Sequence, residues 1–542
     1  MDGGRDLGGL SDEENLHARR IGSRCVAGEA YDAPVNGLRA ALRDFDLRFA
    51  ALWWVVVLWW SSTKAPAGYL LSFDDVWRLI HAHESSHGAL APSEVWPPLQ
   101  FWVLGAALRI WPDAATVPRL VGLLVTAATL VQVGRMAGEM GVGRIGRVAT
   151  MLAFGTLPYV LWLAPSALVE PWTLLAGAYA LRRARRWWVE GDAAALRPAF
   201  VALGLGAMTR YEAWGWIGLL AMACFIARDR GRDVSAAWRP LGLSLLFPAL
   251  WCVAQIAWTG NPFNFGLFAH EFLVQDNPDL TALGRAQDGI EALWEVVLPV
   301  GLGGLGGLLV AGPLRGLSVV IVAALAATVL QVTAHTLGFA GLHNVWRHYL
   351  PLAIPVAIGV GALVDRLSAL GRPVAYLGLA LVLQGSLMLL EWPPVAYEDD
   401  LARVATRLRS LRARAGGTVL IEAIGYETRV LQILLGDMDD ARFDRLVTLV
   451  PLDRPMTDEE KASNTSLFER PFVEVEGTVR REGVKWIAVY TEGALQKARA
   501  VGTVVYAEPE HRVGEWQPEK DEDDGYERPE GRWVIVRVGA AK

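Results

Sequence analysis

Eleven apolar runs, separated by polar segments, follow one another between residues 49 and 391. The first, Phe49–Ser62, is rich in tryptophan and predicts a first membrane span. Several runs are shorter than the roughly 20 residues that cross a bilayer, so neighbouring polar residues are expected to complete the spans. The predicted runs are 49–63, 117–135, 147–164, 168–181, 197–209, 213–227, 240–258, 295–311, 317–337, 349–365 and 374–391.

The arginines between these runs predict the orientation of the chain, because inner loops of membrane proteins carry an excess of Lys and Arg. If the N-terminus is inside, the outer segments carry only Lys64, Arg78, Arg109, Arg210, Arg285 and Arg347. The inner segments then carry Arg39, Arg43, Arg48, Arg135, Arg144, Arg147, Arg182, Arg183, Arg185, Arg186, Arg228, Arg230, Arg232, Arg315, Arg366 and Arg372. We therefore predict an inner N-terminus and an outer C-terminus.

Residues 97–111 are also apolar but are interpreted differently. The segment is short and contains Arg109. Counting it as a span would invert every later loop and place the arginine clusters outside. We therefore expect a helix that lies in the outer interface with its Trp residues at headgroup depth.

The predicted fold is a polytopic α-helical membrane protein of about 11 transmembrane helices with outer interfacial helices, plus a small C-terminal soluble α/β domain. Residues 1–46 form a flexible cytoplasmic tail, 47–394 the transmembrane domain with a large outer loop at 64–116, and 395–542 the outer domain. In the outer domain the pattern predicts a helix at 398–415, strands at 418–424, 485–490 and 533–538, and an acidic loop at 519–530.

Composition agrees with a membrane protein. The 542 residues are 53% hydrophobic and include 23 Trp, and their mean hydropathy is +0.28, which is too apolar for a soluble protein of this size. A net charge of −6 gives no reason to expect a nucleic-acid partner. The cysteines, Cys25, Cys224 and Cys252, show neither disulfide nor metal-binding spacing. For a bacterial source, we expect an inner-membrane protein whose C-terminal domain is periplasmic.

Ionisable residues gather at the predicted outer ends of the spans. Charged groups at membrane depth are costly and usually mark a site. Six separate segments contribute such residues, which predicts a polar cavity where the outer face of the membrane begins. They are Asp74 and Asp75, Arg119, Glu170, Arg210 with Tyr211 and Glu212, His270 with Glu271, and His343 with Arg347 and His348.

Structural explanations compete with a functional one at several positions. The aspartate pair would also suit the first turn of a helix at 75–83, and Arg119 would suit an interfacial anchor. Arg210 and Glu212 could pair across a turn, and Arg347 with His348 could hold lipid headgroups. His81, His83 and His87 lack the arrangement of a metal site, so we interpret them as solvated loop histidines and predict no metal.

Six segments form a recognisable set in their order along the chain. They are Asp74-Asp75, Trp96-Pro97-Pro98-Leu99, Pro118-Arg119-Leu120, Ser166-Ala167-Leu168-Val169-Glu170-Pro171, Met208-Thr209-Arg210-Tyr211-Glu212-Ala213-Trp214 and Arg347-His348-Tyr349-Leu350-Pro351. Together they resemble the type C glycosyltransferase superfamily, whose members use polyprenyl-phosphate-linked sugars and include protein O-mannosyltransferases and the lipid A aminoarabinose transferase. The likeness covers residues 45–390, and no motif extends it to the C-terminal domain.

The resemblance implies a hexosyl- or pentosyltransferase, mannosyltransferase-like, that moves a sugar from a polyprenyl-phosphate donor to a glycan, lipid or protein hydroxyl with inversion. Asp74 is the expected general base and Asp75 its partner, with the two carboxylates raising one pKa. Arg210, Arg347 and His348 are expected to bind the donor phosphate without a metal or other cofactor. The residues expected to bind substrate are Arg119, Glu170, Tyr211, Glu212, His270 and Glu271.

Two other functions remain open at this point. A lipid or glycan transporter would line a pathway with charged groups, but the sequence shows no related halves and few charges at mid-span. The second is a membrane anchor for a C-terminal binding domain, which would not explain the acidic residues on the outer side.

Overall fold

The structure is a computed structural model. It describes residues 44–64, 73–93, 95–267, 270, 281–287, 290–291, 304, 306–309, 314–337, 345–371, 373–374, 376–381, 399–422, 431, 435, 441–443, 468, 471–507 and 532–539. The chain divides into two units, Met1–Leu52 and Trp53–Lys542. The predicted tail at 1–46 falls almost entirely outside the described residues.

Helices occupy most of the predicted apolar runs, whereas the runs at 295–311 and 374–391 lie mostly outside the described residues. Within the described part, four segments are long and apolar enough to cross a membrane: α6, α12, α15 and Tyr349–Ser368. The chain is accordingly an integral membrane protein. The helices are α3 (Phe45–Lys64), α6 (Thr116–Glu139), α7 (Arg144–Gly155), α8 (Pro158–Leu163), α9 (Glu170–Glu190), η1 (Ala193–Ala195), α10 (Leu196–Ala207), α11 (Glu212–Asp229), α12 (Trp238–Thr259), α15 (Leu317–Thr336) and α16 (Ala353–Ser368).

One predicted run is two helices. The run at 147–164 is broken between α7 and α8, where Leu157 is extended at φ −57° and ψ 127°. Pro158 causes the break, because the residue before a proline is driven out of the helical region. Proline is well placed at the start of the new helix, where its missing N–H costs nothing.

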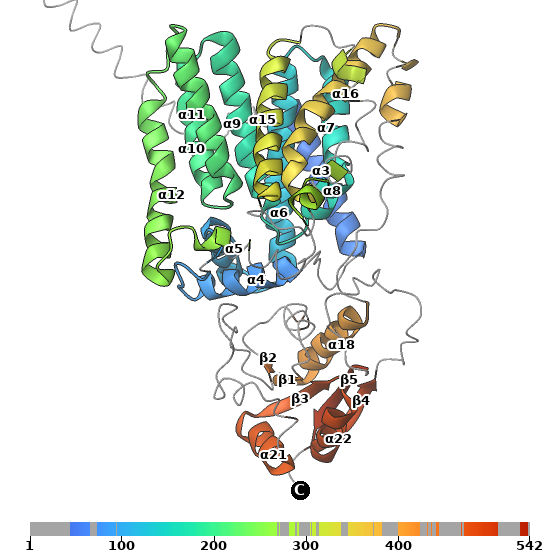
Figure 1. Cartoon of the computed structure of the whole chain (residues 1–542). Helices are drawn as coiled ribbons and strands as arrows, with labels where there is room; N and C mark the ends of the chain where they lie inside the picture. Colours follow the sequence, from blue (N-terminus) through green and yellow to red (C-terminus); the bar gives the residue numbers. More distant parts are fainter. Residues whose placement is uncertain are drawn as a thin grey trace, which may run out of the picture. The chain divides into compact units, whose positions relative to one another are not determined.

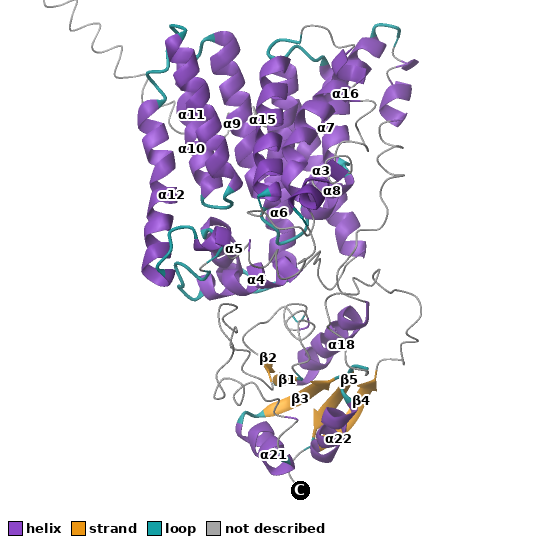
Figure 2. Ribbon diagram, in the orientation of Figure 1, coloured by secondary structure: helices purple, strands orange, loops and turns teal. Residues whose placement is uncertain are grey.

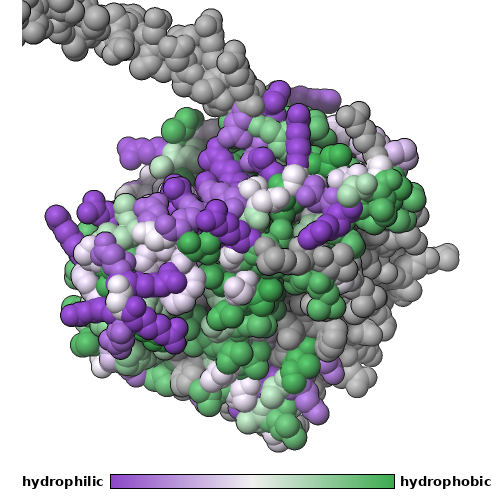
Figure 3. Space-filling view, turned by 90° about the horizontal axis from the view of Figure 1, so that it is seen from above, coloured by the Kyte–Doolittle hydropathy of each residue, from purple (hydrophilic) through white to green (hydrophobic). Residues whose placement is uncertain are grey.

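The long helices pack side by side (Figure 1). Pairs with extensive contact include α7 with α16, α9 with α10, α6 with α9, and α10 with α12. Most of α6 and of Tyr349–Ser368 is buried, whereas less than a third of α12 or α15 is. This division suits a bundle whose outer helices face lipid. Seen from above, hydrophilic residues gather over part of one end of the bundle, beside apolar surface (Figure 3).

Two shorter helices lie at the other end of the bundle and pack against each other, α4 (Phe73–Ser86) and α5 (Leu99–Ile110) (Figure 1). The apolar face of α4, with Val76 and Leu79, is buried together with Leu104 and Leu108 of α5. Gly105 permits this close approach, since a Cβ there would lie 2.7 Å from the carbonyl oxygen of Ala82. A helix was predicted at 97–111, and its interfacial position stays a prediction.

The described part of the C-terminal region forms a five-stranded sheet of order β2-β1-β3-β5-β4 (Figure 2). Strand β1 is parallel to β2 and β3, whereas β5 is antiparallel to β3 and β4. The expected helix at 398–415 is α18, and the three expected strands are β1, β3 and β5. The elements are α18 (Asp399–Ala415), β1 (Thr418–Ile421), β2 (Ala441–Phe443), α21 (Phe472–Arg481), β3 (Val484–Val489), α22 (Glu492–Val501), β4 (Gly502–Ala507) and β5 (Val534–Val538).

Gly122 of α6 provides a test of the packing that supports the site described below. A Cβ at this position would lie 2.4 Å from the carbonyl oxygen of Ala164 and 3.0 Å from that of Ser166. We expect Gly122→Ala to lower stability by about 1–3 kcal/mol, the usual cost of overpacking, measured as a lower midpoint of thermal unfolding in detergent. Gly218→Ala is the control, because a Cβ there meets nothing within 4 Å. Equal midpoints for the two variants would contradict the packing described.

Candidate functional site

Charged side chains from four helices and a turn meet at one place. Asp74 lies in the first turn of α4, and Glu170 and Glu212 are the first residues of α9 and α11. Arg210 lies in the turn between α10 and α11, and Arg347 lies in the 3₁₀ helix η2 (Val345–Leu352). The positive end of a helix dipole favours an acid in the first turn. The folding of these helix starts therefore brings three carboxylates to two arginines.

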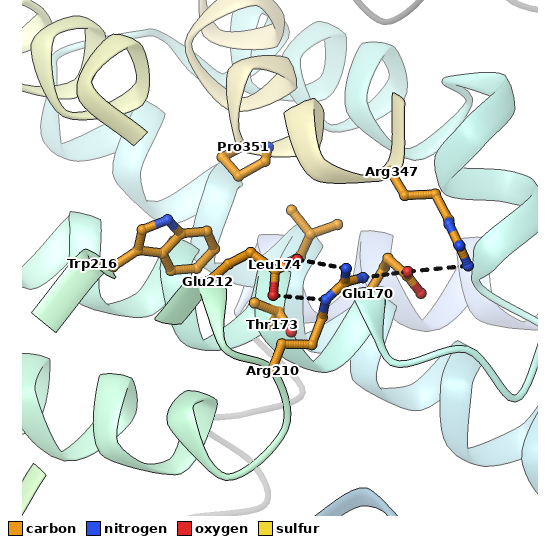
Figure 4. Close-up of a pocket in the computed structure, with 8 residues that line it drawn as sticks. All are labelled: Glu170, Thr173, Leu174, Arg210, Glu212, Trp216, Arg347 and Pro351. Carbon is orange, nitrogen blue, oxygen red and sulfur yellow. Dashed lines mark hydrogen bonds and ion pairs between the residues drawn. The ribbon is translucent and has the colours of Figure 1, made fainter. Parts of the chain in front are cut away.

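The five side chains form a continuous chain of ion pairs. Arg347 Nη1 lies 3.1 Å from Asp74 Oδ2 and 3.6 Å from Glu170 Oε1. Arg210 Nη1 donates to the same Glu170 oxygen, while its Nε donates to Glu212 Oε2 at 2.9 Å. Figure 4 shows Glu170 between the two guanidinium groups. One carboxylate thus joins both arginines of the site.

The middle of this chain is buried and its end at Asp74 is open. The Glu170 side chain is 4% exposed and that of Asp74 is 35% exposed. Within the described part of the chain, Glu170 Oε2 and Arg347 Nε are buried without a hydrogen-bond partner. Buried polar atoms are nearly always satisfied, so these two atoms are available to a bound molecule.

Arg78 belongs to the site although sequence reasoning did not select it. It follows Asp74 by one helical turn, donates through Nη1 to Gln100 Oε1 at 2.9 Å, and lies 4.7 Å from the ring centre of Trp96. Its side chain is buried, and its Nε has no hydrogen-bond partner among the described residues. The i, i+4 spacing from Asp74 was the signal that could have revealed it.

The Asp75 carboxylate differs from that of Asp74 because it forms a hydrogen bond with the protein backbone. Its Oδ1 accepts a hydrogen bond of 2.6 Å from the amide of Ala167, and the residue is fully buried. The carbonyl of the same Ala167 accepts one of 2.5 Å from Gln100 Nε2. Asp75 and Gln100 therefore fix the segment that leads into Glu170, and through Gln100 they also reach Arg78.

The expectation that the two aspartates raise a pKa is wrong for Asp74. Burial alone would raise the pKa of this carboxyl, but the charges of Arg347 and Arg78 outweigh burial and hold the pKa below its usual value. Asp74 is therefore ionised near neutral pH. The arginines, and not the neighbouring carboxyl, dominate its titration.

A small hollow opens beside the ion pairs. Glu170, Arg210, Glu212 and Arg347 form its charged side, as Figure 4 shows. Its other walls come from α9, α11 and η2, so it extends from the ends of the helices along the bundle. The remaining lining residues are Thr173, Leu174, Trp216 and Pro351.

Other predicted site residues are placed differently. Arg119 donates to Ser62 Oγ at 3.0 Å. The Tyr211 hydroxyl donates to the carbonyl of Val95, accepts from Trp251 Nε1 at 3.0 Å, and its ring stacks on Phe265.

Neither Arg119, Tyr211 nor His270 is among the residues that line the hollow. Glu271 and the side chain of His348 lie outside the described part of the structure. Their roles therefore remain predictions.

His81 and His83 lie on α4, and His87 follows it in a turn. His81 is buried, 2.9 Å from Glu84 Oε2 and in contact with Trp77, Trp96 and Phe101. The interpretation as a solvated loop residue is wrong for His81, because it lies on the helix face that packs against these aromatic rings. Across the described ranges, no three His, Cys, Asp or Glu side chains are grouped so that they could hold a metal ion.

A comparison with solved structures agrees with the resemblance predicted from the sequence, which is confirmed at the level of the fold alone. The crystal structure of ArnT from Cupriavidus metallidurans bound to undecaprenyl phosphate matches with a TM-score of 0.52 and 13% sequence identity, covering 90% of this chain and 97% of that one. No family model matches the chain, and no curated protein matches it.

Two further structures align with lower scores, and no argument below rests on them. The apo state of the same ArnT gives a TM-score of 0.48 at 14% identity, covering 90% of this chain and 97% of that one. The archaeal oligosaccharyltransferase AglB from Archaeoglobus fulgidus, in complex with an inhibitory peptide and a dolichol-phosphate, gives 0.42 at 10% identity, covering 86% and 73%.

The ion pair between Asp74 and Arg347 predicts a pH effect. Because the folded pKa of Asp74 is depressed, the pair stabilises the fold above the unfolded pKa of 3.8 and its contribution is lost as pH falls through the lower folded value. Arg347→Gln removes the strongest opposing charge, so the pKa of Asp74 should rise and this acid-dependent contribution should shrink. Thermal unfolding against pH measures the change. If Asp74→Asn in the Arg347→Gln background still alters the acid profile as much as Asp74→Asn alone, the two groups are not coupled.

Proposed function

We propose that the protein is a membrane glycosyltransferase that moves a sugar from a polyprenyl-phosphate donor to an acceptor hydroxyl, with inversion and with Asp74 as general base. The observation that carries the proposal is the chain of ion pairs. It presents one partly open carboxylate, Asp74, paired with Arg347, and Arg347 and Arg210 in turn line a hollow beside the helix ends. Sugar transfer from a lipid phosphate needs this combination of a base and a phosphate-binding cation.

The donor is assigned from the fold and from the arginines. ArnT, which shares the fold, was crystallised with undecaprenyl phosphate, and a lipid phosphate suits an arginine site at the end of a helix bundle. Guanidinium groups bind phosphate through paired hydrogen bonds. Arg347, whose Nε has no partner among the described residues, is the first candidate, and Arg210 the second. His348 stays a further candidate.

The reaction is a direct displacement. The acceptor oxygen attacks the anomeric carbon and forms the new C–O bond, while the bond between that carbon and the phosphate oxygen breaks. The acceptor proton passes to Asp74 Oδ, and the bonding electrons leave with the polyprenyl phosphate. A single displacement inverts the anomeric centre, which agrees with one open carboxylate and not two opposed ones.

The ion pair between Asp74 and Arg347 couples proton transfer from the acceptor to the departure of the phosphate. Before reaction Asp74 and the donor phosphate compete for Arg347. When Asp74 takes the proton it becomes neutral and its hold on Arg347 weakens. The leaving phosphate gains negative charge at the same moment, so the released guanidinium stabilises it when stabilisation is needed.

The remaining residues act around this centre. Asp75 is a positioning residue, because its contact is the backbone before Glu170 and not the open side of the site. Glu170 and Glu212 orient the two arginines and accept hydrogen bonds from sugar hydroxyls. Arg119, Tyr211, His270 and Glu271 remain proposed substrate contacts. The acceptor is a glycan, lipid or protein on the outer face of the membrane, which for a bacterium is the periplasmic side.

Metal dependence is a separate part of the proposal. Arg347 and Arg210 supply the charge that would otherwise come from a divalent cation, so transfer should proceed without one. We expect excess EDTA to leave the transfer rate within two-fold of the untreated rate, roughly the reproducibility of such rates. Loss of activity on chelation that Mg²⁺ or Mn²⁺ restores would show that the arginines are not sufficient.

Substitution of Asp74 tests the central assignment. We expect Asp74→Asn to lower kcat for transfer from a radiolabelled lipid-linked sugar by about 10²–10⁴-fold, because the general base is lost. Arg347→Ala should also lower kcat. Asp75→Asn should act through stability, since an unsatisfied buried amide costs about 1–3 kcal/mol.

Asp233→Asn is the matched control, because Asp233 accepts its hydrogen bond from Ser235 at an exposed turn away from the site. Its kcat should equal that of the unsubstituted chain. Full activity in both Asp74→Asn and Arg347→Ala would end the assignment.

A further inference from the structure

The hollow has one wall that the mechanism leaves unused. Leu174, Trp216 and Pro351 line it opposite the ion pairs. Trp216 lies on α11 one turn after Glu212, and its side chain is only partly buried. Figure 4 shows its indole facing the space beside Glu212 and Arg210. An exposed aromatic face thus adjoins carboxylate and guanidinium groups in one cavity.

The position of this indole depends on a glycine of the neighbouring helix. A Cβ at Gly177 of α9 would lie 2.6 Å from Trp216 Cζ3 and 3.2 Å from its Cη2. Contacts under 3.0 Å are not tolerated. The ring therefore occupies space that any side chain at 177 would take, and it would be pushed aside if one were present.

We infer that Trp216 is a specificity-determining residue that contacts the sugar of the donor, and that Gly177 sets how far its ring enters the hollow. The inference rests on the proposed function and names the part of the donor that this wall recognises. A pyranose or furanose ring has an apolar C–H face bordered by hydroxyl groups. An aromatic wall bordered by carboxylates complements both features in one site.

A sugar suits this cavity better than the isoprenoid part of the donor. Hydrocarbon beside Glu170 would leave its buried Oε2 without a hydrogen-bond donor, which is costly. Sugar hydroxyls would supply donors, and within the described residues Glu170 Oε2 is buried and has no partner. Thr173, which also lines the hollow, adds a hydroxyl on the same side.

A substitution at Gly177 tests the inference independently of Trp216. A methyl group at 177 would displace the indole edge and so change the shape of the hollow that Trp216 lines. The bulk of a hexose, which carries one more carbon than a pentose, should then be excluded first. The change alters the position of the aromatic wall without altering any charged group of the site.

The test compares four variants with three lipids: undecaprenyl phosphate without a sugar, the same lipid carrying a pentose, and the same lipid carrying a hexose. Trp216→Leu removes the aromatic face and keeps an apolar residue, whereas Trp216→Phe keeps a smaller aromatic face. Gly177→Ala moves the indole. Gly204→Ala is the control, because it crowds Ser244 at the interface of α10 with α12 and not Trp216.

For Trp216→Leu we expect KM for the sugar-bearing lipid used by the unsubstituted chain to rise about ten-fold, the loss of one aromatic contact of about 1.4 kcal/mol. Its affinity for the sugar-free lipid should stay within two-fold. Trp216→Phe should recover part of the loss. Gly177→Ala should shift the ratio of kcat/KM values toward the pentose, and Gly204→Ala should not.

The results that would contradict these expectations can be distinguished from one another. If Trp216→Leu weakens the sugar-free lipid as much as the sugar-bearing one, the wall contacts the lipid and the inference is wrong. If both lipid classes are unaffected while the unsubstituted chain transfers sugar, Trp216 is structural and only this inference fails. If the unsubstituted chain neither binds undecaprenyl phosphate nor transfers a sugar from it, the proposed function itself fails.

Discussion

A single buried carboxylate oxygen, Glu170 Oε1, holds the site together. It accepts from Arg210 and lies 3.6 Å from Arg347, so one acid joins a turn between two helices to a 3₁₀ segment 137 positions further along the chain. Glu170 can do so because it begins α9, where the helix dipole favours a negative charge and Pro171 starts the helix at no cost in hydrogen bonds. Without this oxygen two guanidinium groups would face each other at low dielectric.

Glu170 is positioned by hydrogen bonds to the backbone that precedes it. Asp75 binds the amide of Ala167 and Gln100 binds its carbonyl, so both backbone polar groups of this one residue are held from α4 and α5. Gln100 also accepts from Arg78. The same two helices thus position the open acid, Asp74, and the loop that delivers the buried acid. This arrangement explains why neighbouring aspartates, identical in chemistry, serve different purposes: successive residues of a helix point about 100° apart.

Much of the site could be predicted because ionisable residues at membrane depth stand out against apolar runs. Asp74, Glu170, Arg210 and Arg347 were selected on that ground, before any contact between them was known. Arg78 and Trp216 were missed for the opposite reason: a charge in a long loop and a tryptophan in a span are both unremarkable by composition. Side-chain direction also escapes sequence patterns, so the roles of Asp74 and Asp75 could not be separated. In the C-terminal region the short strands β2 and β4 went unpredicted, since each follows a segment with no alternating pattern of its own.

The charges of the site are poorly explained by stability alone. Three arginines and three carboxylates, largely withdrawn from water, gain from one another what they lose in hydration, and apolar side chains of equal volume would often be at least as stable. A fold that needed only packing at this position would have no use for them. Two buried atoms, Glu170 Oε2 and Arg347 Nε, have no hydrogen-bond partner among the described residues, which also favours a functional role for the cluster. The cluster is balanced in net charge and incomplete in hydrogen bonds, which is the state expected of a site that exchanges its internal partners for those of a bound molecule.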